Sequence, residues 1–183
     1  MQLFWPVFKR EFSGYFRTPL GYVFIVLFLI ATTAMTFFVG NFFDSNQASL
    51  AIFFNFIPWI YLIFVPAVGM RLWAEERRVG TIELLLTLPV DLTAAVVAKF
   101  LAAWSFLILT LVLTSPMIFT VSYLGQPDAG VIFSGYLASA LLSGTLLGVT
   151  CLTSALTKNQ VISFILSVVV SFVFLLFGWG VFT

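Results

Sequence analysis

Charged side chains are scarce in this sequence. Asp, Glu, Lys and Arg together make up 8% of its 183 residues, against roughly 25% in a soluble domain. So few charges leave too little polar surface to coat a water-soluble globule. Histidine is absent and Cys151 is the only cysteine, which excludes disulfide frameworks and Cys/His metal sites. The net charge of +1 gives no reason to expect nucleic acid as a partner.

Catalytic motifs are missing as well. No G-x-x-x-x-G-K-[ST] pattern occurs, so this chain binds no nucleotide through a P-loop. Without histidine, the metalloprotease motif H-E-x-x-H is impossible. Asp44, Asp91 and Asp128 all fall in predicted loops, and Lys99 lies near the start of an apolar run. We therefore expect neither an enzyme nor a directly bound cofactor, and a proton relay through the membrane is disfavoured.

Long apolar runs are abundant. Hydrophobic residues make up 62% of the chain, with a mean hydropathy of +1.15. A transmembrane helix needs about 20 apolar residues, and backbone groups in lipid must be satisfied within the segment. We therefore expect one all-α, polytopic membrane domain over residues 1–183, with kinks where Pro58, Pro66 and Pro116 fall. The predicted spans cover about 20–40, 52–69, 96–120, 131–156 and 161–178.

The basic residues predict the orientation of the spans. Seven of the eight Lys and Arg residues lie before the first run, between the second and third, or between the fourth and fifth, and Lys99 lies near the start of the third run, on the same side. The other two connections, 41–51 and 121–130, contain no Lys or Arg. The positive-inside rule assigns the basic side to the cytoplasm. The N-terminus is therefore predicted to be cytoplasmic.

The segment 1–19 precedes the first span. Phe8, Phe12 and Phe16 recur every four residues, with charged residues between them. This spacing places the aromatic rings on one stripe of a helix. We expect a short amphipathic helix that lies in the membrane interface with its Phe stripe at the acyl boundary. Thr18 and Pro19 are expected to end this helix before the span begins. The alternative is a basic lead-in with incidental aromatic residues.

The segment 70–95 is the longest polar stretch and is predicted to be cytoplasmic. Eight of the chain's fifteen charged residues lie between Arg71 and Lys99. Gly80 can end one helix and Thr81 can cap the next. The leucines that follow need a partner, which is either another protein or the chain's own spans in a re-entrant hairpin. Composition alone leaves both readings open.

The fourth predicted span carries small residues at a four-residue spacing. They are Ala140, Gly144 and Gly148. Such a stripe lets two helices approach closely. It serves packing within the chain or a dimer contact, and packing within the chain is the favoured reading.

Two stretches resemble the permease subunits of ABC-2 type transporters, most closely the branch that includes gliding-motility and nitrous-oxide-reductase-maturation permeases. They read KREFSGYFRTPLGYVF over 9–24 and AEERRVGTIELLLTLPV over 74–90. The order of the spans, with a basic lead-in and a large loop after the second, is also similar. Such permeases usually have six spans, so this chain would lack a C-terminal one.

The resemblance implies a coupling role for the loop after the second span. In that family the element docks on a separate ATPase subunit, where leucines would fill a groove and charges would fix the register. The positions of this chain that match are Glu75, Glu76, Arg77, Arg78, Gly80, Thr81, Glu83 and Leu84.

The resemblance also implies partners and a location. We expect two ABC ATPase subunits holding ATP and Mg²⁺, a second permease copy or a homologous permease, and the lipid bilayer of a bacterial cytoplasmic (inner) membrane. An auxiliary membrane or periplasmic subunit is a further candidate partner. The expected function is ATP-driven export or mechanical transmission. The alternative is a membrane anchor or scaffold that recruits a cytoplasmic partner without transport.

Overall fold

The chain folds into a bundle of helices. The computed structural model describes residues 4–42, 49–80 and 92–178, and no strand occurs within these ranges. The helices are α1 (Phe4–Arg17), α2 (Pro19–Ala34), the π-helical turn η1 (Met35–Val39), α3 (Ala51–Gly69), α4 (Arg71–Val79), α6 (Leu92–Val112), α7 (Pro116–Leu124), α8 (Ala129–Leu156) and α9 (Gln160–Gly178).

Five stretches of helix are long and apolar enough to cross a membrane. Each overlaps one of the apolar runs in the sequence, so the prediction of an all-α membrane bundle with five spans is confirmed. The segment 70–95 is helical at both of its described ends, because α4 continues the second span and α6 opens the third. The five candidate spans are Pro19–Val39, Ala51–Val79, Thr93–Leu124, Ala129–Leu156 and Gln160–Gly178.

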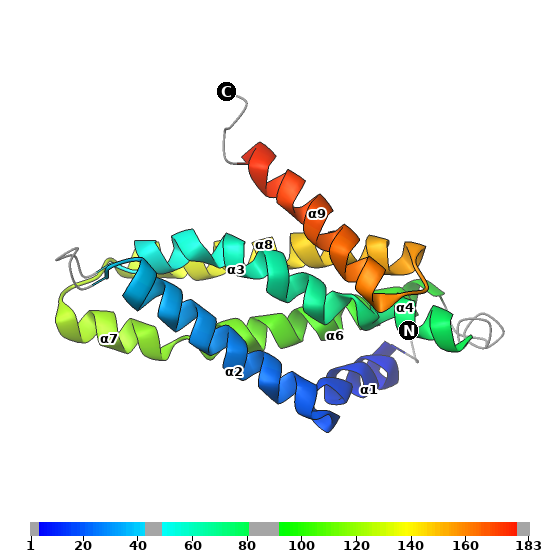
Figure 1. Ribbon diagram of the computed structural model, residues 1–183. Helices are drawn as coiled ribbons and strands as arrows, with labels where there is room; N and C mark the ends of the chain where they lie inside the picture. The colour runs from blue at the N-terminus through cyan, green and yellow to red at the C-terminus, as the bar shows by residue number, and fades with distance from the viewer. Residues whose placement is uncertain (1–3, 43–48, 81–91, 179–183) are drawn as a thin grey trace.

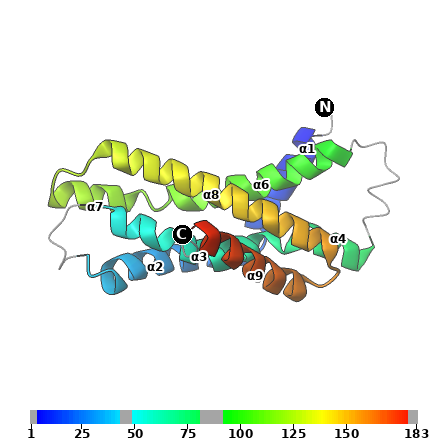
Figure 2. The ribbon, with the colours of Figure 1, turned by 90° about the horizontal axis from the view of Figure 1, so that it is seen from above.

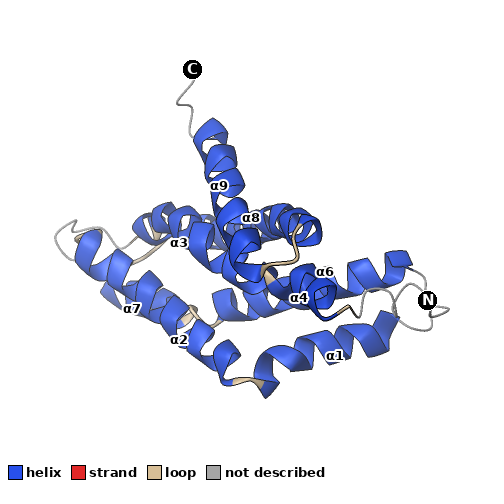
Figure 3. Cartoon of the chain, turned by 45° about the vertical axis from the view of Figure 1, so that its right-hand side comes forward, coloured by secondary structure: helices blue, strands red, loops and turns tan. Residues whose placement is uncertain are grey.

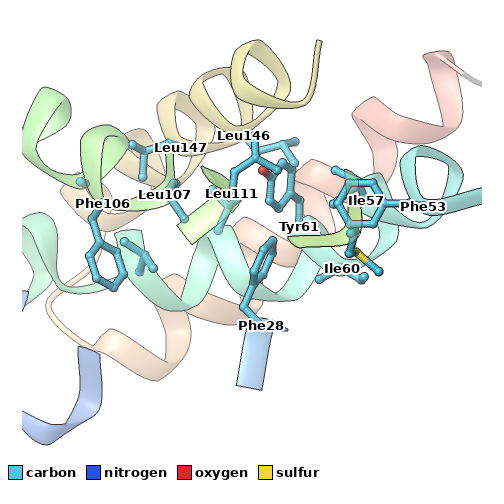
Figure 4. Packing of buried hydrophobic residues seen from close by; sticks show 14 of the residues in the cluster. Phe28, Phe53, Ile57, Ile60, Tyr61, Phe106, Leu107, Leu111, Leu146 and Leu147 are labelled. Atoms are coloured by element: carbon cyan, nitrogen blue, oxygen red, sulfur yellow. The ribbon is translucent and has the colours of Figure 1, made fainter. Parts of the chain in front are cut away.

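Helix α3 lies at the centre of the bundle. The bundle is elongated, and α9 leaves its long axis at an angle (Figures 1 and 2). Buried side chains of α3 such as Phe53 and Tyr61 meet Phe28 of α2, Phe106 of α6 and Leu146 of α8 in one hydrophobic cluster (Figure 4). The Phe28 and Tyr61 rings stack with their centroids 5.9 Å apart.

Proline acts differently at its three positions. Pro58 and Pro66 lie inside the continuous helix α3. Pro116 instead opens α7, after α6 has ended at Val112. The third span is thus broken into two helices, because proline fits the first turn of a helix but removes a hydrogen bond in its interior.

The outside of the bundle is apolar and part of its inside is polar. On α9, Ile165 and Phe174 are more than half exposed, whereas Ser163, Ser167 and Ser171 are fully buried. The three serines recur every four residues, so they form one stripe on the face of α9 that packs against α3 and α8. Lipid-facing helices show this arrangement, with apolar chains outward and small residues between helices.

Helices α1 and α2 meet at a sharp elbow (Figure 3). Thr18 between them is extended, with φ −107° and ψ 143°, and Pro19 starts α2. The prediction that Thr18 and Pro19 end the first helix is therefore confirmed. The elbow lets α1 pack along α6 while α2 runs into the bundle.

Candidate functional site

Helix α4 extends the second span beyond a break at Met70. Gly69, the last residue of α3, lies so close to α8 that an added Cβ would stand 2.5 Å from Cγ2 of Thr150. The absence of a side chain at Gly69 therefore lets α3 touch α8 just before α4 begins. Leu72, Trp73 and Ala74 in the first part of α4 are buried.

A serine from another helix holds the start of α4. The Ser154 hydroxyl of α8, which is fully buried, accepts hydrogen bonds from the backbone N–H groups of Trp73 and Ala74, both at 3.1 Å. It donates to the Met70 carbonyl at 3.0 Å. Nearby, the Trp73 indole donates to the Cys151 sulfur at 3.2 Å. The first N–H groups of a helix need outside partners, and Ser154 supplies a cap from 80 residues away.

A buried ion cluster joins α1, α4 and α6 beside the start of α4. Lys99 of α6 is only 3% exposed. Its ammonium lies 2.5 Å from Oε1 of Glu76 on α4 and 3.4 Å from Oε1 of Glu11 on α1. It also donates to the Leu72 carbonyl at 3.4 Å and stands 5.3 Å from the centroid of the Trp73 ring. These partners satisfy a charge that would otherwise be costly to bury.

The predicted coupling residues divide between two faces of α4 and the segment beyond it. Glu75, Arg77 and Arg78 are exposed, whereas Glu76 points inward to Lys99 and its side chain is 14% exposed. Gly80 ends α4 in the left-handed region with φ 78°, a conformation that favours glycine. The prediction that Gly80 ends this helix is confirmed. Thr81, Glu83 and Leu84 lie outside the described residues.

The aromatic stripe of α1 packs against α6. Phe12 and Phe16 both contact the core cluster, and the ring centroids of Phe16 and Phe106 lie 5.7 Å apart. Phe8 stacks on Phe12 at 5.9 Å. The aromatic stripe thus packs against the chain's own helices. That it lies at the acyl boundary of the membrane stays a prediction.

Tyr15 lies beside this stripe and stacks on Phe106 at 4.6 Å. Burial raises the pKa of the Tyr15 hydroxyl above its ordinary value, and the charge of Glu11 raises it further, whereas Arg71 lowers it. Tyr15 therefore stays neutral at physiological pH. A neutral phenol is compatible with its place between aromatic rings and the ion cluster.

The small-residue stripe of α8 receives a tryptophan of α6. The Trp104 indole donates to the Ala140 carbonyl at 3.0 Å, and an added Cβ at Gly144 would stand 3.1 Å from Nε1 of Trp104. Gly148 has open space around its missing Cβ. At Ala140 and Gly144 the stripe therefore serves a contact within the chain.

Sequence reasoning did not foresee the ion cluster or the serine cap. One signal was present, because a lysine at the edge of an apolar run requires a partner. Nothing in the spacing of Glu11, Glu76 and Lys99 identifies them as neighbours. Among the residues that the structure describes, no three His, Cys, Asp or Glu side chains form a metal-binding group. The contacts of Lys99 and Ser154 form one junction between α1, α4, α6 and α8.

Comparison with known proteins assigns the chain to a family. The sequence model described as "ABC-2 family transporter protein" matches residues 52–183, which include all of α3 except its first residue, and also α4, α6, α7, α8 and α9. No curated protein and no solved structure matches. The match covers well over half of the chain, so this protein belongs to the ABC-2 family of transporter proteins.

Proposed function

We propose that this chain is the permease subunit that couples ATP hydrolysis on separate ATPase subunits to export or mechanical transmission. As an ABC-2 family permease it is a membrane component of an ABC transporter, and the family implies an ABC ATPase partner. The finer resemblance of 74–90 to gliding-motility and nitrous-oxide-maturation permeases favours export, extraction or force transmission. The proposed location is the inner membrane of a bacterium.

The observation that carries this proposal is the junction at α4. Helix α4 continues the second span, and Lys99 and Ser154 attach it to α6, α1 and α8. A partner that displaces α4 would therefore displace several spans together. Packed helices shift between discrete arrangements when one element is moved. The exposed side chains of Glu75, Arg77 and Arg78 at the outer end of α4 offer charged contacts to such a partner.

The proposed assembly has two ATPase subunits, each holding ATP and Mg²⁺, and two permeases, either two copies of this chain or this chain and a homologue. The segment after Gly80 would dock on the ATPase through Thr81, Glu83 and Leu84. An auxiliary membrane or periplasmic subunit is a further proposed partner.

Copurification tests the proposal. The chain is extracted in mild detergent, and mass spectrometry identifies what elutes with the wild type, with Glu83→Arg, and with a double variant Arg77→Glu/Arg78→Glu. Lys158→Glu is the matched control, because Lys158 is an exposed basic residue of another connection on the same predicted side. An ATPase with Walker motifs should elute with wild type and the control and be lost from both loop variants.

The competing function is a membrane anchor that recruits a cytoplasmic partner without transport. It predicts that no ATPase elutes with the folded wild-type chain. If an ATPase does elute with the wild type, the anchor reading predicts that the rate of ATP hydrolysis does not depend on the loop. The recovered ATPase is therefore mixed with equal amounts of the purified wild-type chain or of Arg77→Glu/Arg78→Glu, and a rate of ATP hydrolysis that changes with the wild type alone would support coupling.

A further inference from the structure

A cavity lies inside the elbow of α1 and α2. It has a volume of about 460 Å³, within the range of about 300–1,000 Å³ that small-molecule sites occupy. Its walls come from α1, α2, the α3–α4 junction and Phe106 of α6. The elbow itself is clear in Figure 3, where α1 and α2 diverge below the rest of the bundle. By the positive-inside rule this end of the bundle is at the cytoplasmic surface of the membrane.

One side of the cavity is charged. Glu11 of α1 and Arg71 and Glu75 of α4 line it. Arg71 and Glu75 are exposed, and neither makes an ion pair with another residue in the described ranges. Oε1 of Glu11 is already paired, because it lies 3.4 Å from the Lys99 ammonium and 3.6 Å from the Arg10 guanidinium. Among the described residues, the lining therefore offers the Arg71 guanidinium and the Glu75 carboxylate without ion-pair partners, and the Glu11 carboxylate as a further acceptor.

Another part of the lining is apolar. Leu20, Val23 and Leu27 of α2 line the cavity and are exposed, and Ala67 and Val68 of α3 continue this wall. These residues belong to two of the candidate membrane spans. The cavity therefore passes from a zwitterionic mouth at the membrane surface to an apolar wall within the hydrocarbon.

We propose that this cavity binds the headgroup of a zwitterionic phospholipid with a primary amine, namely phosphatidylethanolamine. Arg71 would bind the phosphate, because a guanidinium matches phosphate oxygens in geometry and charge. Glu75 and Glu11 would accept hydrogen bonds from the ammonium. The start of an acyl chain would lie along Leu20, Val23 and Leu27, and the rest would remain in the bilayer.

The charge of the mouth decides between lipid classes. An anionic headgroup such as phosphatidylglycerol supplies a phosphate for Arg71 but no cation for the carboxylates, which repel its negative charge. Phosphatidylcholine carries a quaternary ammonium that has no N–H to donate. Phosphatidylethanolamine alone among these three supplies both a phosphate for Arg71 and a cation with N–H groups that can donate to the carboxylates. This inference does not depend on the proposed coupling to ATP hydrolysis.

Native mass spectrometry of the purified chain tests the site. The protein is mixed with phosphatidylethanolamine, phosphatidylglycerol or phosphatidylcholine of identical acyl chains, and bound fractions are compared at equal concentration. We expect phosphatidylethanolamine to bind about fivefold more tightly than either other lipid, the ratio that about 1 kcal/mol gives. Arg71→Gln should weaken its binding about fivefold. Glu75→Gln should remove most of its advantage over phosphatidylglycerol.

The matched control is Arg78→Gln, which removes an exposed arginine of α4 that does not line the cavity. It should bind each lipid as wild type does. Water-soluble glycerophosphoethanolamine should fail to displace the lipid at equal concentration, because it lacks the acyl chain. Equal binding of the three lipids to wild type, or equal effects of Arg71→Gln and Arg78→Gln, would overturn the proposal. If circular dichroism shows Arg71→Gln to be unfolded, Glu75→Gln decides through the headgroup preference.

Discussion

Lys99 shows how one charged side chain can organise several helices. It is 3% exposed and lies against the carboxylates of Glu11 on α1 and Glu76 on α4. Glu11 precedes Lys99 by 88 positions in the chain, and Glu76 precedes it by 23. Buried ion pairs are weak sources of net stability, but removing one partner leaves an uncompensated charge. The cluster therefore acts mainly by fixing which helices meet and at what height.

Replacing Lys99 by methionine should destabilise the fold strongly. The change keeps most of the side-chain volume but removes the buried cation that lies against the carboxylates of Glu76 and Glu11, at a cost of about 3–5 kcal/mol. Thermal unfolding in detergent, followed by circular dichroism, measures the loss. Lys158→Met is the control, because Lys158 is exposed and should tolerate the change.

The double variant Lys99→Met/Glu76→Gln then tests the pairing itself. Because the second change removes the buried charge, the double variant should be more stable than Lys99→Met alone. Residues in one ion pair give such non-additive effects. Strictly additive losses would mean that the two side chains do not interact in the folded protein.

Ser154 acts as a cap supplied by a neighbouring helix. Its hydroxyl binds two N–H groups and one carbonyl around the start of α4. Ser154→Ala should lower the free energy of unfolding by about 1–2 kcal/mol, the usual effect of losing a cap. Ser134→Ala provides the comparison, because Ser134 is an exposed serine of the same helix that bonds only to the Val131 carbonyl among the described residues. Similar melting temperatures for both variants would contradict the capping role.

At the scale of elements, α8 is the helix against which α3, α4, α6 and α9 all pack. Small residues make these contacts possible at separate points along its length. Gly144 faces the Trp104 indole, and Gly135 faces the ring of Phe54, whose nearest atom would lie 2.4 Å from an added Cβ. Close approach of helices in membranes depends on such positions, because apolar burial between helices adds little in lipid.

Gly144→Val and Gly148→Val should therefore differ. They place the same side chain on the same helix four residues apart, so their helix propensities match. At Gly144 the new methyl groups meet Trp104, whereas Gly148 has open space. Overpacking costs about 1–3 kcal/mol, so the melting temperature of Gly144→Val should fall well below that of Gly148→Val. If Gly148→Val is the less stable of the two, the glycine must contact a partner outside this chain.

At the scale of the whole molecule, the orientation of the bundle follows from its charges. Arg77 and Arg78 end α4, and Lys158 lies in the connection of α8 to α9. The connection of α7 to α8, with Asp128, contains no basic residue. The positive-inside rule therefore predicts that α4 lies on the cytoplasmic side and the α7–α8 connection on the outside.

Cysteine labelling in intact cells tests this orientation. In a Cys151→Ala background, Gln126→Cys in the α7–α8 connection and Arg78→Cys at the end of α4 each place a single thiol at an exposed position. A membrane-impermeant maleimide should label Gln126→Cys at once and Arg78→Cys only after the membrane is opened. The reverse pattern would invert the topology and remove α4 from reach of a cytoplasmic ATPase.

The sequence by itself determined the fold class, the five spans and the ends of several helices. These features are local: the length of an apolar run, the proline after Thr18 and the glycine at residue 80 act on their own segments of chain. The resemblance of 74–90 also pointed to the family that the comparison of residues 52–183 supports.

Only the tertiary structure decided which polar groups meet. Glu75 and Glu76 are adjacent in the sequence, yet one faces water and the other Lys99, since neighbouring residues of a helix point about 100° apart. The Ser154 cap and the Trp104 contact likewise join residues that are 36 or more positions apart. Their partners depend on how whole helices pack, and helix packing is set by the shapes of many side chains at once, which no single stretch of sequence encodes.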